Sequence, residues 1–305
     1  MPELTITIIA LSTITANPKN PSAKFYNLSM PELPEVEVTC QGLRKHLLGR
    51  TVENIWYSGL PLRTVFDIDR IRDDLEQKKL VAVSRRAKYL QLHFDHEALL
   101  VIHLGMTGNL GIFEQDTPRK KHDHLEWRFA DGTLLRFNDS RRFGSITHVP
   151  AETVASLEKT LYRTTGPEPF SEIFNGAYLQ RLARNRTVAV KQLIMTNQVV
   201  AGVGNIYANE SLFRAGIRPA RRIATISPSR WQGLATCIRE VLSEAIACGG
   251  STISDFVNAS RETGYFQVNF RVYGRQGQPC TVCRTTIEKQ MIGGRASYYC
   301  PVCQK

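Results

Sequence analysis

A proline and two glutamates near the start of the chain could perform covalent chemistry at a carbonyl-like carbon. The segment from Met30 to Glu35 reads MPELPE and places Pro31 directly after a methionine. If translation starts at Met30 and that methionine is removed, Pro31 becomes a terminal secondary amine. Such groups titrate at roughly pH 7.7–8.0, so a fraction is neutral and nucleophilic at cellular pH. The amine could form a Schiff base, with Glu32 and Glu35 moving protons around it.

The same residues also fit the start of an ordinary helix. Pro34 suits a first helical turn, and acidic residues favour the positive end of a helix. Apolar residues then recur at helical spacing, at Val36, Cys40, Leu43 and Leu47. The two interpretations are compatible, and local physics alone does not choose between them.

Four cysteines near the C-terminus have the spacing of a metal site. Cys280 and Cys283 form one Cys-x2-Cys pair, and Cys300 and Cys303 form a second pair after sixteen residues. Two such pairs complete a tetrahedron around zinc. Because four protein ligands leave no open position, we predict one structural Zn²⁺. Arg295 lies between the pairs and is either a phosphate contact or an ordinary solvated arginine.

The charge of the chain is large and unevenly distributed. The formal net charge of the 305 residues is +11 at pH 7, which favours a polyanionic partner, most often nucleic acid. Residues 176–230 contain nine lysines and arginines against one acid, and residues 261–305 contain seven against two. The basic character therefore belongs to the C-terminal half.

The first thirty residues need separate treatment. Residues 4–14 are apolar, but eleven residues cannot span a membrane, and the segment lacks the basic start and cleavage site of a signal peptide. We expect residues 1–30 to be non-native or removed, with the true start at Met30. A processed leader and an unprocessed tail on an inactive protein are the alternatives, since an amide at Pro31 has no nucleophilic lone pair.

The first half of the chain is expected to consist mainly of strands, which would position the residues around Pro31. Residues 88–94 alternate between apolar and polar, and residues 99–104 form a continuous apolar run. Asp131-Gly132 separates two alternating runs and predicts a hairpin. We expect a two-layer β-sandwich flanked by helices over residues 31–160.

The second half of the chain is expected to be helical. Gly and Pro residues mark a linker at residues 161–175. Helical patterns follow at residues 178–183, 188–195, 206–214 and 229–247. The predicted fold class is α+β with several domains: the sandwich, a helical domain at residues 176–262, and a cysteine-rich unit at residues 263–305.

Further motifs, taken with the Pro31 segment and the cysteines, resemble the formamidopyrimidine-DNA glycosylase family. The resemblance runs from Pro31 to Lys305, in the family's order. The motifs are Arg85–Leu90, His103–Gly108, His122–His124, Asp139–Gly144 and Gly202–Ala208. The resemblance implies that the N-terminal domain is catalytic, that residues 176–262 form a helix–two-turns–helix DNA-binding domain, and that the C-terminus is a zinc finger.

The resemblance also implies an activity. The chain would be a bifunctional glycosylase and AP lyase of base excision repair, removing oxidised purines such as formamidopyrimidines and 8-oxoguanine. Pro31 would attack C1′ of the damaged nucleotide, and Glu32 would act as acid and base. Lys88 matches the lysine assigned to β-elimination, or it binds a phosphate, and Arg295 matches the arginine assigned to δ-elimination.

The resemblance also implies which residues contact DNA. Met106, Arg141 and Phe143 resemble the trio that fills the duplex where the lesion has flipped out, since apolar wedges offset lost stacking. Further family positions that contact DNA are His122, Arg186, Asn205 and Lys191, besides Arg141. The open N–H groups at the helix after Gly204 would hold a phosphate, and residues 251–264 would form the lesion-recognition loop.

Two other functions remain open at this point. An endonuclease VIII-like glycosylase would take oxidised pyrimidines, although the residues from Leu33 to Val36 favour the formamidopyrimidine branch. A non-catalytic zinc protein that binds damaged DNA would fit if Pro31 is not exposed. The expected partner is double-stranded DNA with oxidised bases or abasic sites, bound by a monomer in the bacterial cytoplasm at the nucleoid, with no membrane association.

The position of the N-terminus is the first testable prediction. Protein purified without an N-terminal tag should have an intact mass that lacks residues 1–30, because the chemistry requires a free amine at Pro31. Retention of Met1 in material that still cleaves damaged DNA would contradict it.

Overall fold

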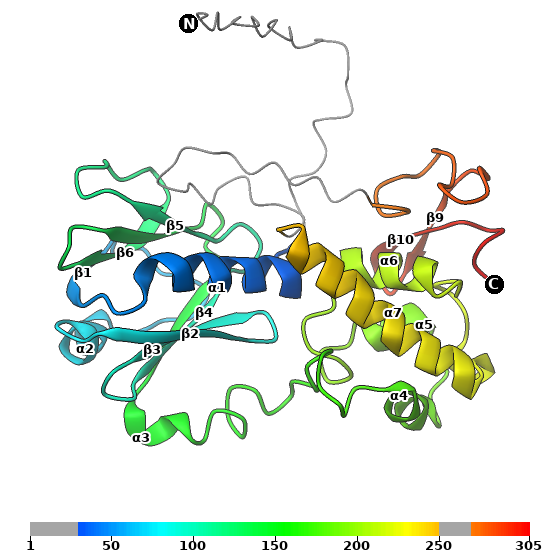
Figure 1. Ribbon diagram of the computed structural model, residues 1–305, viewed down its shortest axis with the longest axis horizontal. Helices are drawn as coiled ribbons and strands as arrows, with labels where there is room; N and C mark the ends of the chain where they lie inside the picture. The colour runs from blue at the N-terminus through cyan, green and yellow to red at the C-terminus, as the bar shows by residue number, and fades with distance from the viewer. Residues whose placement is uncertain (1–29, 250–269) are drawn as a thin grey trace, which may run out of the picture.

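Two four-stranded antiparallel sheets form the N-terminal domain of the computed structural model, which describes residues 30–249 and 270–305 (Figure 1). One sheet has the order β1-β6-β7-β5 and the other β2-β3-β4-β8. The strands are β1 (Val52–Tyr57), β2 (Leu80–Arg86), β3 (Tyr89–Phe94), β4 (Leu99–His103), β5 (Asn109–Phe113), β6 (Asp123–Phe129), β7 (Leu134–Asn138) and β8 (Ser145–Val149). The predicted sandwich is confirmed.

The strand patterns explain which faces are buried. Side chains of β3 alternate between buried and half-buried, while the first four residues of β4 are all buried. Gly132 lies in the turn between β6 and β7 with φ +85°, a conformation that glycine adopts without steric cost. The hairpin predicted at Asp131-Gly132 is therefore confirmed.

Helix α1 (Leu33–Leu47) joins this sandwich to the rest of the protein (Figure 1). Its buried side chains include the predicted stripe of Val36, Cys40, Leu43 and Leu47, each with no exposed surface. The helix contacts β2 and also α7 (Pro228–Ala247). The second helix of this domain, α2 (Ile68–Leu75), begins at an Asp67 cap and packs on β1.

The helical domain has a core of its own, built around α6 and α7. After the short α3 (Ala151–Val154), the helices are α4 (Gly176–Ala183), α5 (Val190–Ile194) and α6 (Asn205–Arg214), followed by α7. Apolar side chains from all four longer segments meet in one cluster that includes Leu193, Tyr207 and Trp231. Each helix predicted after the linker is present, with shifts of a few residues at the ends.

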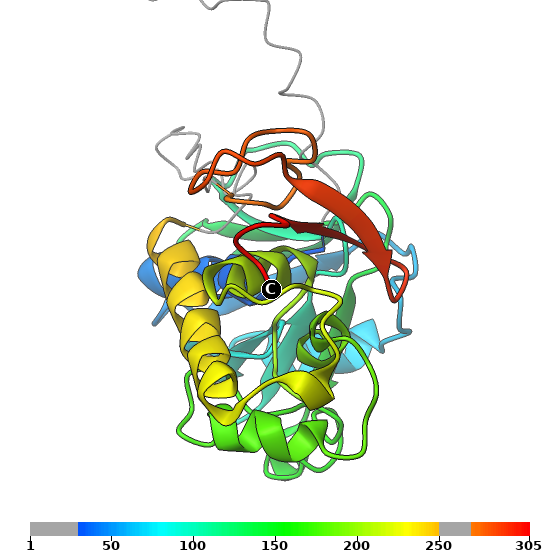
Figure 2. The ribbon, with the colours of Figure 1, turned by 90° about the vertical axis from the view of Figure 1, so that its right-hand side faces the viewer.

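The C-terminal unit is a hairpin held against α6. Strands β9 (Glu288–Ile292) and β10 (Arg295–Tyr299) pair antiparallel, and β10 contacts α6 (Figure 2). The amide side chain of Asn209 accepts a hydrogen bond from the Tyr298 backbone N–H at 2.7 Å. Glu210 accepts three backbone N–H groups, from Arg271, Val272 and Tyr273. One helix thus fixes the orientation of the whole unit.

A half-buried ion cluster joins the linker to the sandwich. The carboxylate of Glu168 accepts hydrogen bonds from the Ala87 N–H at 2.7 Å, from Arg85 at 2.7 Å and from Arg86 at 2.9 Å. These cations hold the pKa of Glu168 below its usual value although burial opposes them. The cluster fixes the turn between β2 and β3, where Lys88 lies.

Some expectations fall outside what the structure describes. The segment of residues 1–29 and the predicted recognition loop at residues 251–264 lie outside the described residues, and the domain boundaries stay predictions. Within residues 30–249 and 270–305, no helix is long and apolar enough to cross a membrane.

Candidate functional site

The carboxylate of Glu32 is the centre of the site. Glu32 precedes α1, is 2% exposed, and reaches the first turn of α6. It accepts hydrogen bonds from the backbone N–H groups of Gly204 at 2.8 Å, Ile206 at 2.9 Å and Tyr207 at 3.4 Å. Free N–H groups and the helix dipole make a helix N-terminus a good site for an anion. That anion is a side chain of the same protein.

This arrangement corrects one expectation from the sequence. We expected the N–H groups after Gly204 to hold a DNA phosphate, but those of Ile206 and Tyr207 donate to the Glu32 carboxylate, as does that of Gly204 itself. The glycines have a steric role instead. A Cβ on Gly204 would lie 2.3 Å from Cδ of Glu32, and one on Gly202 would lie 2.6 Å from Cβ of Leu33.

A second carboxylate, Glu35, supports the first. Its Oε2 accepts the Glu32 backbone N–H at 2.9 Å, and its Oε1 accepts the Tyr207 hydroxyl at 2.6 Å. The spacing of Glu32 and Glu35 is that of a capping box. That signal was present in the sequence, whereas the contact with Tyr207 could not be read from it.

Burial changes the acidity of Glu32. It raises the pKa of Glu32 to about 7, while Lys88 and the N–H groups of Ile206 and Tyr207 oppose the shift. A carboxyl group with such a pKa can both donate and accept a proton near neutral pH. The positive charge of Lys88 acts on the same carboxylate and favours its ionised form.

Pro31 is covalently next to this carboxylate. It is half-buried and lies just before α1, whose Leu33 N–H donates to the Gly202 carbonyl at 3.0 Å. That hydrogen bond fixes the start of α1 against the helical domain. The proposed nucleophile and its proposed proton donor are thus held together at the junction of the two domains.

Lys88 follows a residue with unusual backbone geometry. Ala87 has φ +53° and is buried, and its N–H is the group that Glu168 accepts. A left-handed conformation is uncommon for a residue with a Cβ. Near Lys88, burial lowers the pKa of His103 to about 4, and Lys88 and Arg63 add to this effect. His103 is therefore neutral at physiological pH beside these cations.

The structure corrects the prediction for Lys191. We expected it to contact DNA, but it is 1% exposed, and its Nζ donates to the Ala296 carbonyl and the Ser297 hydroxyl, each at 2.7 Å. Burial lowers its pKa to about 7, Glu32 opposes this shift, and Arg295 adds to it. Lys191 thus holds β10 against α5, in a position that links the surroundings of Glu32 and Arg295.

Arg295 itself is exposed at the start of β10. Arg295 and Glu32 both act electrostatically on the buried Lys191, with opposite effects on its pKa.

The three residues expected to fill the duplex lie on two loops joined by Asp139. Met106 is half-buried on the loop after β4, while Arg141 and Phe143 are exposed on the loop after β7. The buried Asp139 carboxylate accepts the Thr107 hydroxyl from the first loop and the Gly144 N–H, at 2.8 Å, from its own. Sequence reasoning did not identify this link.

The remaining predicted DNA contacts lie at different depths. Arg186 is exposed after α4, and His122 is half-buried just before β6. Asn205 is half-buried at the start of α6. Burial raises the pKa of the neighbouring Tyr273 hydroxyl, and a hydrogen bond with the Asn205 side chain opposes that shift.

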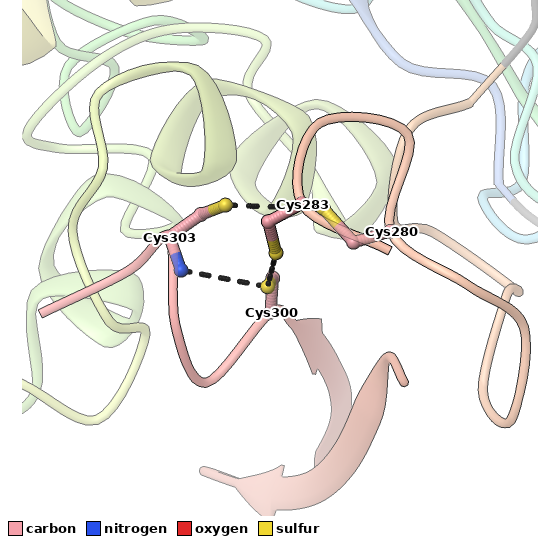
Figure 3. A group of neighbouring side chains, drawn as sticks. All are labelled: Cys280, Cys283, Cys300 and Cys303. Carbon is pink, nitrogen blue, oxygen red and sulfur yellow. Dashed lines mark hydrogen bonds between the residues drawn. The ribbon is translucent and has the colours of Figure 1, made fainter. Parts of the chain in front are cut away.

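The four predicted zinc ligands meet at the base of the C-terminal hairpin (Figure 3). Their sulfur atoms lie within 4.8 Å of one another, the only group of its kind among the described residues. Cys283 and Cys300 are 3.4 Å apart and Cys280 and Cys303 3.9 Å apart, while backbone N–H groups of Val282 and Cys303 point at sulfurs. This donor set fits one structural Zn²⁺.

Three family models match the chain. The formamidopyrimidine-DNA glycosylase N-terminal domain matches residues 30–146, and the H2TH domain of the same family matches residues 165–257. A zinc finger found in FPG and IleRS matches residues 277–305.

Curated relatives and solved structures agree with these models. Formamidopyrimidine-DNA glycosylases of Alcanivorax borkumensis (46% identical over 276 residues) and Methylococcus capsulatus (47% over 278) align with 90% of this chain and with all of their own length. A complex of the Lactococcus lactis protein with abasic-site DNA has a TM-score of 0.81 at 33% identity, covering 90% of this chain and 99% of that one. A variant of that protein bound to Fapy-dG-containing DNA has a TM-score of 0.82 at 35% identity, covering 90% of this chain and 100% of that one.

Zinc should be structural and necessary for the C-terminal unit. Replacing Cys283 with serine should release about one zinc per chain and weaken DNA binding, because the hairpin that carries Arg295 is too small to fold without its metal. Elemental analysis and a binding assay measure this, and Cys248→Ser is the matched control because Cys248 is exposed and lies outside the cluster. An unchanged metal content would refute the ligand assignment.

Proposed function

Because the chain belongs to the formamidopyrimidine-DNA glycosylase family and is a DNA glycosylase of base excision repair, we propose that its reaction runs through the amine of Pro31. The supporting observation is the buried Glu32 carboxylate next to Pro31 in the chain, with its pKa near neutrality. A nucleophile and a proton carrier adjacent in the chain match the requirements of covalent base excision.

In the first step, the nitrogen lone pair of Pro31 forms a bond to C1′ of the damaged nucleotide. The glycosidic bond breaks with its electron pair on the base, and the base takes up a proton as it leaves. The attached nitrogen is now cationic and gives up its proton, so it can become an iminium as the C1′–O4′ bond opens and O4′ takes up a proton. Glu32 is the group placed to protonate the base, to accept the proton from the nitrogen and to pass it to O4′.

In the later steps, strand cleavage follows by successive elimination. We assign β-elimination to Lys88 and δ-elimination to Arg295. The Glu168 cluster supports the first assignment because it fixes the turn that carries Lys88. The second is supported by Lys191, which holds β10 while Arg295 itself stays exposed.

The substrate is duplex DNA with an oxidised purine, or with an abasic site. The relatives' name and the neighbour bound to Fapy-dG-containing DNA support the purine class. Exposed Arg141 and Phe143, whose side chains stack with the guanidinium carbon 4.6 Å from the ring centre, would enter the space that the flipped nucleotide leaves. Met106 would enter from the adjoining loop. We propose a monomer that works on nucleoid DNA.

The reaction requires a free amine at Pro31. The family model begins at residue 30, and relatives align over their whole length with 90% of this chain, which supports a functional start at Met30 followed by loss of that methionine. A protein that keeps residues 1–30 would have an amide nitrogen at Pro31 and could only bind.

Borohydride trapping tests the covalent step. Protein beginning at Pro31, mixed with DNA carrying an oxidised purine, should give a reduced covalent adduct, because an iminium is reducible. The full-length chain is the matched control and should give none. Pro31→Gly keeps an amine of different basicity, so it should slow adduct formation without abolishing it. Tight binding without adduct or strand cleavage would leave only the damaged-DNA-binding function.

Glu32→Gln tests the proton carrier. It should slow base release by about 100-fold or more, the usual range for a general acid, while cleavage of a preformed abasic site falls much less because no base has to leave. Since burial raises the pKa of Glu32 to about 7, its protonated fraction falls as the pH rises through 7. Single-turnover base release by the wild type should therefore contain a decline above pH 7 that the variant lacks. Equal losses on both substrates would contradict this role.

A further inference from the structure

Three successive cations between β5 and β6 have no role described so far. They are Arg119, Lys120 and Lys121, in a basic turn of residues 118–122 that ends at the predicted DNA contact His122. Arg119 is neutralised from within, since its Nη2 lies 2.9 Å from Glu126 and its guanidinium carbon lies 4.1 Å from the centre of the Trp56 ring. The other two side chains are exposed. Neither forms an ion pair with an acid in the described part of the chain.

The backbone of this basic turn is held by buried groups beneath it. The guanidinium of Arg136, which is 2% exposed, donates to the Pro118 carbonyl at 2.9 Å, to the Thr117 carbonyl and to Glu126 at 2.6 Å. Asp123 accepts the Lys120 N–H at 2.7 Å. The backbone that carries the two lysines is therefore preorganised, and the Nζ of Lys120 lies 5.9 Å from the centre of the Phe113 ring.

The basic turn adjoins the loop that carries Arg141 and Phe143. The carbonyl of His122 accepts the Asp139 N–H at 3.0 Å, and Asp123 pairs with Asn138 across β6 and β7. The turn that carries the two lysines is therefore on the same rim of the sandwich as the residues proposed to enter the duplex. DNA held by that loop would continue past the basic turn.

We propose that Lys120 and Lys121 bind phosphates of the duplex beyond the lesion and add affinity that does not depend on sequence. The proposal rests on the proposed function, because it requires DNA to lie against the Asp139–Gly144 loop. Lysine suits this task as a flexible point charge that needs no fixed geometry. The acids on the same connection, Glu114 and Asp116, are also exposed and form no ion pair with either lysine, so the two positive charges are not cancelled.

The double change Lys120→Gln/Lys121→Gln tests this contact. Binding to a duplex with a tetrahydrofuran abasic analogue is measured over a range of salt concentrations. Each lost phosphate contact makes the plot of log affinity against log salt less steep by about 0.9. The slope for the double variant should therefore be less steep by about 1.8. The control variant Lys78→Gln/Lys79→Gln removes the same charge immediately before β2, at the end opposite the turn that carries Lys88. It should leave the slope unchanged.

The outcomes separate this contact from the proposed reaction. A slope equal to that of the wild type would overturn the contact, and so would equal losses in both double variants, which would reflect net charge alone. The Lys120→Gln/Lys121→Gln variant should give as much borohydride adduct as the wild type when the protein is present in saturating excess over the DNA. If the wild type gives no adduct, the proposed reaction fails, yet the salt slopes still decide the contact.

Discussion

The structure depends on one buried anion placed at the end of one helix. Glu32 accepts three N–H groups from the first turn of α6, and a carboxylate without such partners would be costly to bury. The same contact brings the start of α1 onto the helical domain. Gly204 is required because any larger residue would displace the carboxylate. The catalytic proposal and the domain interface therefore rest on the same few atoms.

Other charged side chains extend this pattern. Glu168 holds the turn before Lys88, Glu210 holds the approach to the zinc finger, and Lys191 holds β10. In each case a charged side chain is bonded to backbone groups of another region, which satisfies buried polar atoms and fixes the relative position of two segments. Exposed side chains such as Arg295 then project from a rigid frame, as an active site requires.

Local patterns predicted the elements and the metal site well, because periodicity, turn residues and cysteine spacing are local properties. Partners distant in sequence could not be predicted in this way. The bond from Glu32 to Ile206 spans 174 residues, and nothing at either position reveals it, so the helix start was assigned to a phosphate. Lys191 was assigned to DNA because it lies in the basic segment of residues 176–230, while its actual partners lie 105 and 106 residues away.

The contact between Glu32 and α6 also sets an order of events during synthesis. Tyr207 is made 175 residues after Glu32, and at 5–20 residues per second the interval is roughly 10–35 s. Until then the carboxylate has no helix end to receive it, so the emerging chain can build its sandwich but not its reactive centre. The hairpin with Arg295 is translated later still. A nascent chain would thus carry Pro31, Glu32 and Lys88 before the helix end that places Glu32 exists, and it would complete its proposed reactive centre only after α6 is made.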